Sequence, residues 1–152
     1  MSKEEDHKDS GGEAPGLKVR YIEQQEPLAF FRFQETPLRE VVEELPDGYY
    51  ETNLRGDLIA FNRALCRIHG YSPEEMVNMN FREYTPKEKQ ESILGTYQEV
   101  YSTGQPVEIL DFQVTRPDGS ICVIHTSAYL VRDREGTPTG FRGISRDVTE
   151  QK

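Results

Sequence analysis

Cys66 and His69 come nearest to a catalytic pair in this 152-residue chain. They stand three residues apart in a predicted helix, so their side chains share a face and can touch. A thiolate nucleophile also needs oxyanion-stabilising donors and an open cleft, and the neighbouring sequence suggests neither. We therefore predict a regulatory domain and not an enzyme, with Cys66 a small core residue and His69 a surface or hydrogen-bonded core residue.

Metal and phosphate sites are also poorly supported by the residue spacing. A zinc site needs four ligands, whereas the chain has two distant cysteines, Cys66 and Cys122, and three scattered histidines. Gly140 and Gly143 fall within a predicted strand and do not precede a helix, so they do not form a phosphate-binding loop. We expect no metal, and the two cysteines should be reduced core residues.

The net charge of −9 argues against nucleic-acid binding, which depends on Lys and Arg side chains that neutralise phosphates. Contact with an anionic membrane is disfavoured for the same reason. No apolar run approaches the roughly 18 residues of a membrane helix, and the polar N-terminus does not resemble a secretory signal. These features predict a cytoplasmic protein.

Hydrophobic periodicity and turn residues predict an α+β fold. Asp-Gly and Glu-Gly pairs separate β-branched runs, which is typical of hairpins, so 107–115, 120–131 and 140–148 should form an antiparallel meander. Two short strands are expected at 49–53 and 58–61. Helices are expected at 36–45, after the caps Asn62 and Ser72, and from Pro86 to about Ser102.

Two blocks of sequence carry a family resemblance. Residues 56–66 and 68–76 contain a turn glycine, an apolar strand, an Asn helix cap and a Gly-Tyr-Ser segment followed by two acidic residues. Residues 117–120 read Pro-Asp-Gly-Ser, and 146–152 read Arg-Asp-Val-Thr-Glu-Gln-Lys. Together, over about 37–152, they resemble a PAS domain with its C-terminal PAC motif, the sensory-box module of bacterial signalling proteins.

The resemblance implies a five-stranded antiparallel sheet of order 2-1-5-4-3, with helices on one face and a pocket between the two layers. It also implies a signal-transduction module of a two-component system, coupled to a histidine kinase or diguanylate cyclase. The expected division is a disordered tail at 1–16, a flanking segment at 17–36, the PAS domain at 37–149 and the start of an output linker at 150–152. Signal transfer would involve Arg146, Asp147 and Thr149.

Strand alternation, combined with the resemblance, assigns side chains to the two faces of the sheet. The helix-facing set includes Leu110, Val114, Cys122 and Gly143. The residues expected to line a pocket are Phe61, Ile93, Tyr97, Phe112, Ile124, Thr126, Ala128, Phe141 and Ser145. Whether these residues enclose a small-molecule site or fill a tight core stays open at this point.

The resemblance identifies no cofactor and argues against two. Haem-binding relatives use a His in the long helix, where this chain places Ile93. Flavin-binding relatives that form a cysteine adduct carry an Asn-Cys-Arg-Phe-Leu run after the Gly-Tyr motif, and this chain has Met-Asn-Phe-Arg-Glu at 79–83.

The opposite sheet face, with Ile109, Ile121, His125 and Val131, is expected to be too apolar to remain in water. Segment 17–34 is the expected cover, in the same chain or exchanged in a homodimer. The interface candidates are Leu28, Phe30, Phe31, Phe33, Val123, Tyr129 and Ile144. The alternative to a ligand sensor is therefore a ligand-free module whose function is homodimerisation.

Overall fold

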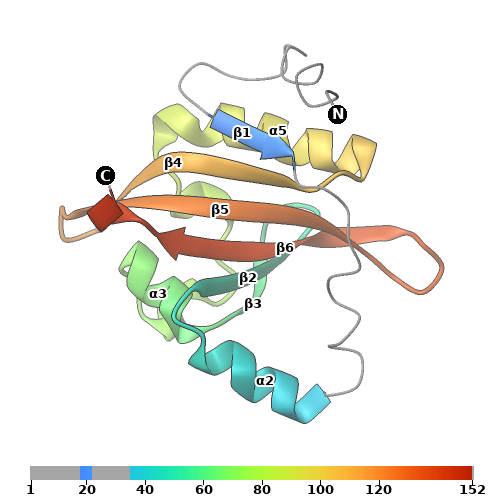
Figure 1. Ribbon diagram of the computed structural model, residues 1–152, viewed down its shortest axis with the longest axis horizontal. Helices are drawn as coiled ribbons and strands as arrows, with labels where there is room; N and C mark the ends of the chain where they lie inside the picture. The colour runs from blue at the N-terminus through green and yellow to red at the C-terminus, as the bar shows by residue number, and fades with distance from the viewer. Residues whose placement is uncertain (1–17, 22–34, 152) are drawn as a thin grey trace.

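The computed structural model describes residues 18–21 and 35–151, and Figure 1 shows one sheet with α3 and α5 behind it. The sheet is antiparallel throughout, and its order is β1-β4-β5-β6-β2-β3. The strands are β1 (Lys18–Tyr21), β2 (Gly48–Asn53), β3 (Leu58–Phe61), β4 (Val107–Thr115), β5 (Ile121–Arg132) and β6 (Pro138–Asp147). Without β1, the remaining five strands have the expected order 2-1-5-4-3, so that prediction is confirmed and a sixth strand is added.

The helices are short apart from α2 and α5, and two of them begin at the predicted caps. Asn62 Oδ1 accepts a hydrogen bond from the Leu65 amide at 3.1 Å, and Ser72 and Glu75 form a reciprocal capping box. The predicted helix from Pro86 begins later, because Pro86 has a ψ of 140° and only a 3-10 turn precedes Gln90. The helices are α2 (Glu35–Glu44), α3 (Arg63–His69), α4 (Pro73–Met76), η2 (Phe81–Glu83), η3 (Lys87–Lys89), α5 (Gln90–Thr103) and η4 (Thr149–Gln151).

A β-bulge in β4 reverses part of the predicted face assignment. The pairing with β5 shifts between Ile109 and Phe112, and Asp111 adopts a left-handed φ of 56°. Both Ile109 and Phe112 therefore point toward the helices, and Ile109 is fully buried. The placement of Ile109 on the outer face and of Leu110 on the inner face was wrong, because one inserted residue changes the alternation.

Segment 17–34 was expected to cover the outer face, and of this segment the structure describes only 18–21, which extends the sheet. Lys18–Tyr21 pairs with β4 at the sheet edge, and Val19 and Tyr21 pack against the main hydrophobic core. Arg20 pairs with Glu108 across the two strands. The candidates Leu28, Phe30, Phe31 and Phe33 lie outside the described residues.

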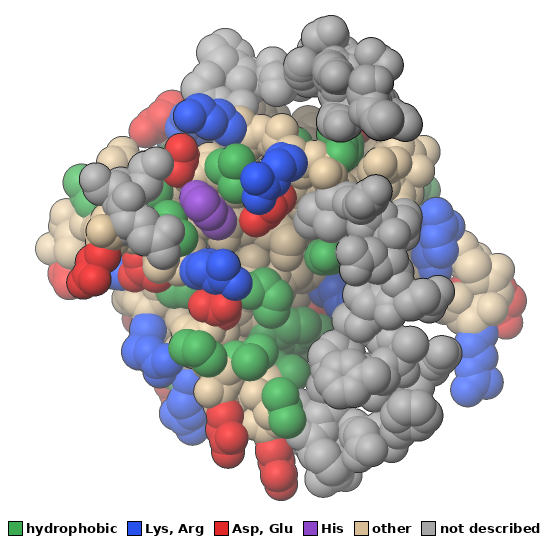
Figure 2. All heavy atoms as spheres, in the orientation of Figure 1, with side chains coloured by type: hydrophobic (Ala, Val, Ile, Leu, Met, Phe, Trp, Pro, Cys, Tyr) green, Lys and Arg blue, Asp and Glu red, His purple; other side chains and the backbone are tan. Residues whose placement is uncertain are grey.

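The inner face of the sheet holds the core. Ile93 and Val100 of α5 pack with Ile109, Phe112 and Ile124 in one buried cluster, and a second cluster joins α3 to β2 and β3. The outer face keeps a band of apolar side chains among charged ones (Figure 2). None of the described helices is long and apolar enough to cross a membrane.

Candidate ligand cavity

A cavity of about 70 Å³ lies between the inner face of the sheet and the helices. Its lining comes from β2, β4, β5 and β6, from α3 and α5, and from the segments around η2 and the β2–β3 turn. Seven of the predicted residues line it: Ile93, Tyr97, Phe112, Ile124, Thr126, Phe141 and Ser145. Ligand binding by these residues stays a prediction.

Phe61 and Ala128 lie outside the lining. Phe61 ends the edge strand β3 and packs, half-buried, against the second core cluster. Ala128 pairs with Val107 at the start of β4 and is completely enclosed in the main core. Both residues pack against the hydrophobic core, but the cavity does not extend along the whole sheet.

Tyr50 and Tyr97 form a hydrogen-bonded pair at the cavity wall. Their hydroxyl oxygens are 2.7 Å apart, and the Tyr50 hydroxyl also lies 2.6 Å from the Ser127 carbonyl oxygen. Because Tyr50 has one proton and donates it to that carbonyl, Tyr97 donates to Tyr50. Burial raises the pKa of Tyr97 to about 12 and that of Tyr50 well above its usual value, so both phenols remain protonated at neutral pH.

Gly143 provides the room for this pair. A Cβ at position 143 would lie 1.9 Å from the Ser127 carbonyl oxygen and 2.9 Å from the Tyr50 hydroxyl. Neither distance is compatible with a real side chain. The glycine therefore permits both the close approach of β5 and the buried phenol.

Two hydroxyl groups of the sheet also face each other in the cavity wall. Thr126 and Ser145 are cross-strand partners on β5 and β6, and their side-chain oxygens are 2.6 Å apart. Both residues are buried. Each hydroxyl satisfies part of the other's hydrogen-bonding capacity without any charged group.

His69 differs from every other polar residue of the wall. It is 4% exposed, it lines the cavity, and its Nδ1 has no hydrogen-bond partner among the described residues. Its ring lies 4.7 Å from that of Tyr84. Burial, with a smaller contribution from the charge of Arg116, lowers the pKa of His69 to about 4. The prediction of a surface or hydrogen-bonded histidine was wrong, although the spacing of Leu65 and His69 on one helix face pointed inward.

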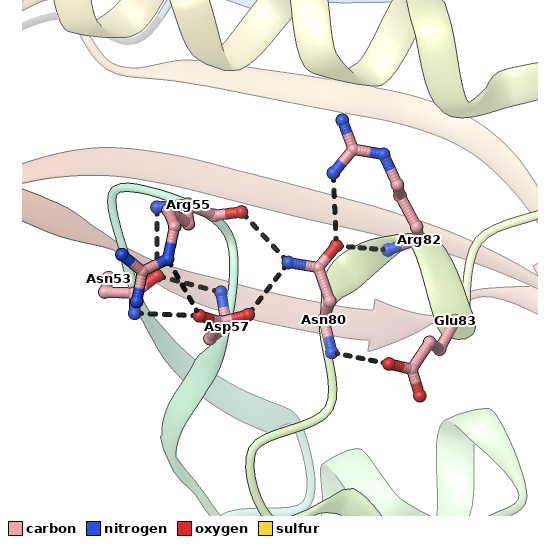
Figure 3. Close-up of polar contacts among 6 residues, drawn as sticks. All are labelled: Asn53, Arg55, Asp57, Asn80, Arg82 and Glu83. Carbon is pink, nitrogen blue, oxygen red and sulfur yellow. Dashed lines mark hydrogen bonds and ion pairs between the residues drawn. The ribbon is translucent and has the colours of Figure 1, made fainter.

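The β2–β3 turn forms one edge of the cavity through Leu54, Arg55 and Gly56. Asn80 holds this turn with its side-chain amide, which donates to the Arg55 carbonyl at 3.0 Å and to Asp57 Oδ1 at 2.9 Å (Figure 3). The hydrogen bonds from Asn80 and then Asn53 lower the pKa of Asp57. These hydrogen bonds connect the turn to the segment that leads into η2.

Phe81 completes this edge. Its amide donates to the Gly56 carbonyl at 3.0 Å, and its ring occupies the space that a side chain at position 56 would need. Gly56 also has a φ of 91°, which favours glycine. Two local constraints, the contact with the Phe81 ring and the positive φ, therefore explain the turn glycine of the family motif.

The three predicted signal-transfer residues lie at the end of β6. The Thr149 hydroxyl accepts from the Val123 amide at 3.0 Å, and Val148 donates to the Val123 carbonyl at 2.8 Å. Partial burial of Asp147 opposes its ionisation, but hydrogen bonds from Thr149 outweigh this and lower its pKa. Arg146 pairs with Asp47 at 3.4 Å, near the start of β2.

Arg116 connects this end of β6 to the cavity wall. Its Nε donates to the Ile68 carbonyl at 2.9 Å, one residue before His69, and its guanidinium lies 3.8 Å from Asp147. Arg116 follows β4 and precedes the predicted Pro-Asp-Gly turn, and it was not predicted from the sequence. No sequence pattern marks such a contact between distant segments.

The described residues contain no group of three or more His, Cys, Asp or Glu side chains arranged to hold a metal ion. Cys66 and Cys122 are both free and buried. Burial raises the pKa of each thiol, so neither is activated as a thiolate. Cys66 instead points its sulfur at the Asn62 carbonyl.

Comparison with known families matches residues 42–152 to the family described as PAS fold. This chain belongs to the PAS family. PAS domains are sensory, regulatory modules of signal transduction, and the sheet, the helices and the motifs described above agree with that membership. A PAS domain from Colwellia psychrerythraea has a TM-score of 0.65 and 21% identity to this chain, covering 74% of it and 94% of that domain.

Two curated relatives are much longer proteins. A probable diguanylate cyclase, DgcE of Escherichia coli, is 26% identical over 118 residues, which cover 78% of this chain and 11% of that protein. The methyl sulfide methyltransferase-associated sensor of Methanosarcina acetivorans is 25% identical over 138 residues, which cover 90% of this chain and 13% of that protein. This PAS chain thus corresponds to a small part of each.

Proposed function

We propose that this PAS domain is the sensory input of a signalling protein, and that a small molecule in its cavity changes the conformation of the segment after β6. The proposal rests on two strands, β5 and β6, that contribute both to the cavity and to the contacts at the end of the domain. β5 and β6 supply Thr126 and Ser145 to the cavity, and the same strands hold the end of the domain through Val123 and Asp147. A ligand that moves the hydroxyl pair acts on strands that also anchor Thr149.

Arg116 supports a second connection between the cavity and that segment. It bonds the last turn of α3 and also reaches Asp147, so a shift of α3 alters the electrostatic partner of β6. The Arg116 side chain is 21% exposed and that of Asp147 is 44% exposed, so solvent partly screens this contact. Arg146, Asp147 and Thr149 are accordingly the proposed signal-transfer residues.

The names of the two longer relatives, a probable diguanylate cyclase and a sensor, support an output domain that this domain would control. We propose a parent protein that is a diguanylate cyclase or a histidine kinase of a bacterial two-component system, located in the cytoplasm. In such a protein η4 would continue into the connecting helix. A ligand would then act by its differential affinity for two conformations of that junction.

A metabolite library screened by thermal shift and native mass spectrometry tests the sensing function. Leu94 is half-buried and lines the cavity, so Leu94→Trp should fill it and abolish the thermal shift caused by a hit. The matched control is Tyr101→Trp, because Tyr101 is 48% exposed on the same helix and does not line the cavity. A library without any hit, or a hit that Leu94→Trp still binds as tightly as the wild type, contradicts the proposal.

Homodimerisation is the second candidate, and the outer face of the sheet favours it. Val123, Tyr129 and Ile144 remain only half-buried there, and Ile121 is 52% exposed. Apolar side chains of this kind form the centre of many protein interfaces. The proposed interface consists of these residues together with the undescribed flanking segment.

Sedimentation velocity of Ile144→Asp tests the dimer. A shift from dimer to monomer supports the interface, and Val77→Asp is the control because Val77 is 57% exposed on a different part of the surface. A wild-type chain that is monomeric at high concentration contradicts the dimer while leaving ligand sensing in place.

A further inference from the structure

The unpaired nitrogen of His69 is the most unusual polar atom of the described residues. Buried polar atoms nearly always have a partner, and a buried one without a partner costs free energy. In the described residues Nδ1 of His69 is the one such side-chain atom. Tyr84 and Leu65 lie in the wall near it, and Nδ1 has almost no accessible surface, so a ligand in the cavity reaches this nitrogen only if a neighbouring wall side chain moves.

We infer that His69 recognises the ligand, and that the ligand is a compact, uncharged, planar molecule with a hydrogen-bonding group, such as a five-membered azole. This inference rests on the proposed sensing function and adds the class of ligand and the residue that selects it. A neutral imidazole offers one N–H donor and one lone pair, so it can bind a ring nitrogen, an N–H group or a carbonyl.

The charges around the cavity favour an uncharged ligand. Among the described lining residues, Arg55 is the one with a full charge, and it lies at the edge with 82% of its side chain exposed and an ion pair to Asp57 at 3.4 Å. None of the described residues that line the cavity carries a carboxylate. Arg116 lies beside the Ile68 carbonyl and already pairs with Asp147, so a charged ligand at His69 would lose its hydration without gaining an unpaired ionic partner.

The aromatic walls of the cavity favour a flat ligand, and its size limits that ligand to fewer atoms than benzene, so a five-membered ring enters only if wall side chains move. About 70 Å³ is less than half of the roughly 150 Å³ of an engineered cavity that binds benzene. Aromatic rings contribute much of the wall, including Phe81, Tyr84, Phe112 and the edge-to-face pair of Tyr97 and Phe141 at 4.9 Å. Such rings pack well against another flat π-system.

The test uses three small probes with the whole chain: pyrazole, thiophene and acetate. Pyrazole has a donor and an acceptor on a five-membered ring, thiophene has a ring of similar size without a strong hydrogen-bonding group, and acetate is small and charged. The affinities are measured by NMR titration, with the ring ¹⁵N signals of His69 as the direct readout. Pyrazole should bind most tightly and should shift those signals.

His69→Phe keeps an aromatic ring and removes both nitrogens. It should raise the melting temperature of the free protein, because an unpaired buried nitrogen is removed, and it should weaken pyrazole binding about tenfold, the value of one hydrogen bond. His69→Gln keeps a donor and an acceptor and should retain part of the affinity. The matched control is His125→Phe, because His125 lies on the outer face beside Asp111 and should leave pyrazole binding unchanged.

Equal pyrazole affinity of His69→Phe and the wild type overturns the inference while the sensing function stands. Tighter binding of acetate, or equal binding of thiophene, overturns the ligand class. A lower melting temperature of a folded His69→Phe shows that Nδ1 is already satisfied, and this also overturns the inference. Failure of all three probes to bind overturns it as well, whereas the library screen decides the sensing function separately.

Discussion

Tyr50 and His69 line the same cavity and are equally buried, at 5% and 4% exposure, yet their hydrogen bonding is opposite. The Tyr50 hydroxyl donates a hydrogen bond to the Ser127 carbonyl and accepts one from Tyr97. His69 Nδ1, by contrast, has no partner in the described residues. A satisfied buried group stabilises one conformation, and an unsatisfied one retains free energy that a ligand can recover. We call the side of the cavity with Tyr50 and Tyr97, on β2 and α5, the structural wall. We call the side with His69, at the end of α3, the receptive wall.

Gly143→Ala should have the largest effect on the structural wall. The added Cβ would overlap the Ser127 carbonyl oxygen and contact the Tyr50 hydroxyl, so we expect a loss of about 3 kcal/mol in the free energy of unfolding. Denaturant titration measures this loss. Gly95→Ala is the control, because nothing lies within 4 Å of the new Cβ and alanine favours a helix by about 0.5–1 kcal/mol. A loss below about 1 kcal/mol for Gly143→Ala would show that β5 and Tyr50 adjust easily.

Acidification should have the next largest effect on the free energy of unfolding, through His69 in the receptive wall. The pKa of His69 is lowered from 6.5 to about 4 in the folded chain, so between these values the unfolded state binds more protons. Stability should therefore fall as the pH falls from about 6.5 to 4, by about 3 kcal/mol in total. His69→Phe should show less of this decline, while carboxyl groups contribute equally to both proteins. Identical pH profiles of the two proteins would contradict a buried neutral imidazole.

Tyr50→Phe should cost about 2 kcal/mol, because it leaves the Ser127 carbonyl and the Tyr97 hydroxyl without their shared partner. Tyr97→Phe should cost about half as much, since Tyr50 still donates to the carbonyl. Thermal or chemical unfolding of the two variants measures the difference. Equal losses, or a larger loss for Tyr97→Phe, would contradict the assigned direction of the two hydrogen bonds.

The sequence was sufficient for five of the six described strands and for the caps Asn62 and Ser72, because these depend on local turn chemistry, and the family resemblance supplied the order of those five strands. Strand β1 was not predicted. The prediction from the sequence also failed at Asp111, where a non-glycine residue takes a left-handed conformation and shifts Ile109 to the inner face. Asp tolerates that conformation better than most residues, but its presence alone does not mark a bulge.

The candidate site also has a part that was predicted from the sequence and a part that was not. Seven lining residues follow from strand alternation combined with the family resemblance, because alternation separates the two faces of the sheet and the resemblance identifies the face that the helices cover. The isolation of His69 Nδ1 depends instead on neighbours from η2 and on Arg116, which are distant in sequence. Arg116 itself could not be found from the sequence, since its two contacts exist only after β4, α3 and β6 have packed.

Coupling between the cavity and the segment after β6 would make this domain a sensor. The most direct measurement is amide hydrogen exchange of Val123 and Val148, whose N–H groups bond Thr149 and the Val123 carbonyl, with and without a cavity ligand. We predict that ligand binding changes exchange at these two amides by severalfold in the wild type and leaves them unchanged in Leu94→Trp. A ligand that fills the cavity while exchange at Val123 and Val148 stays the same would contradict the account.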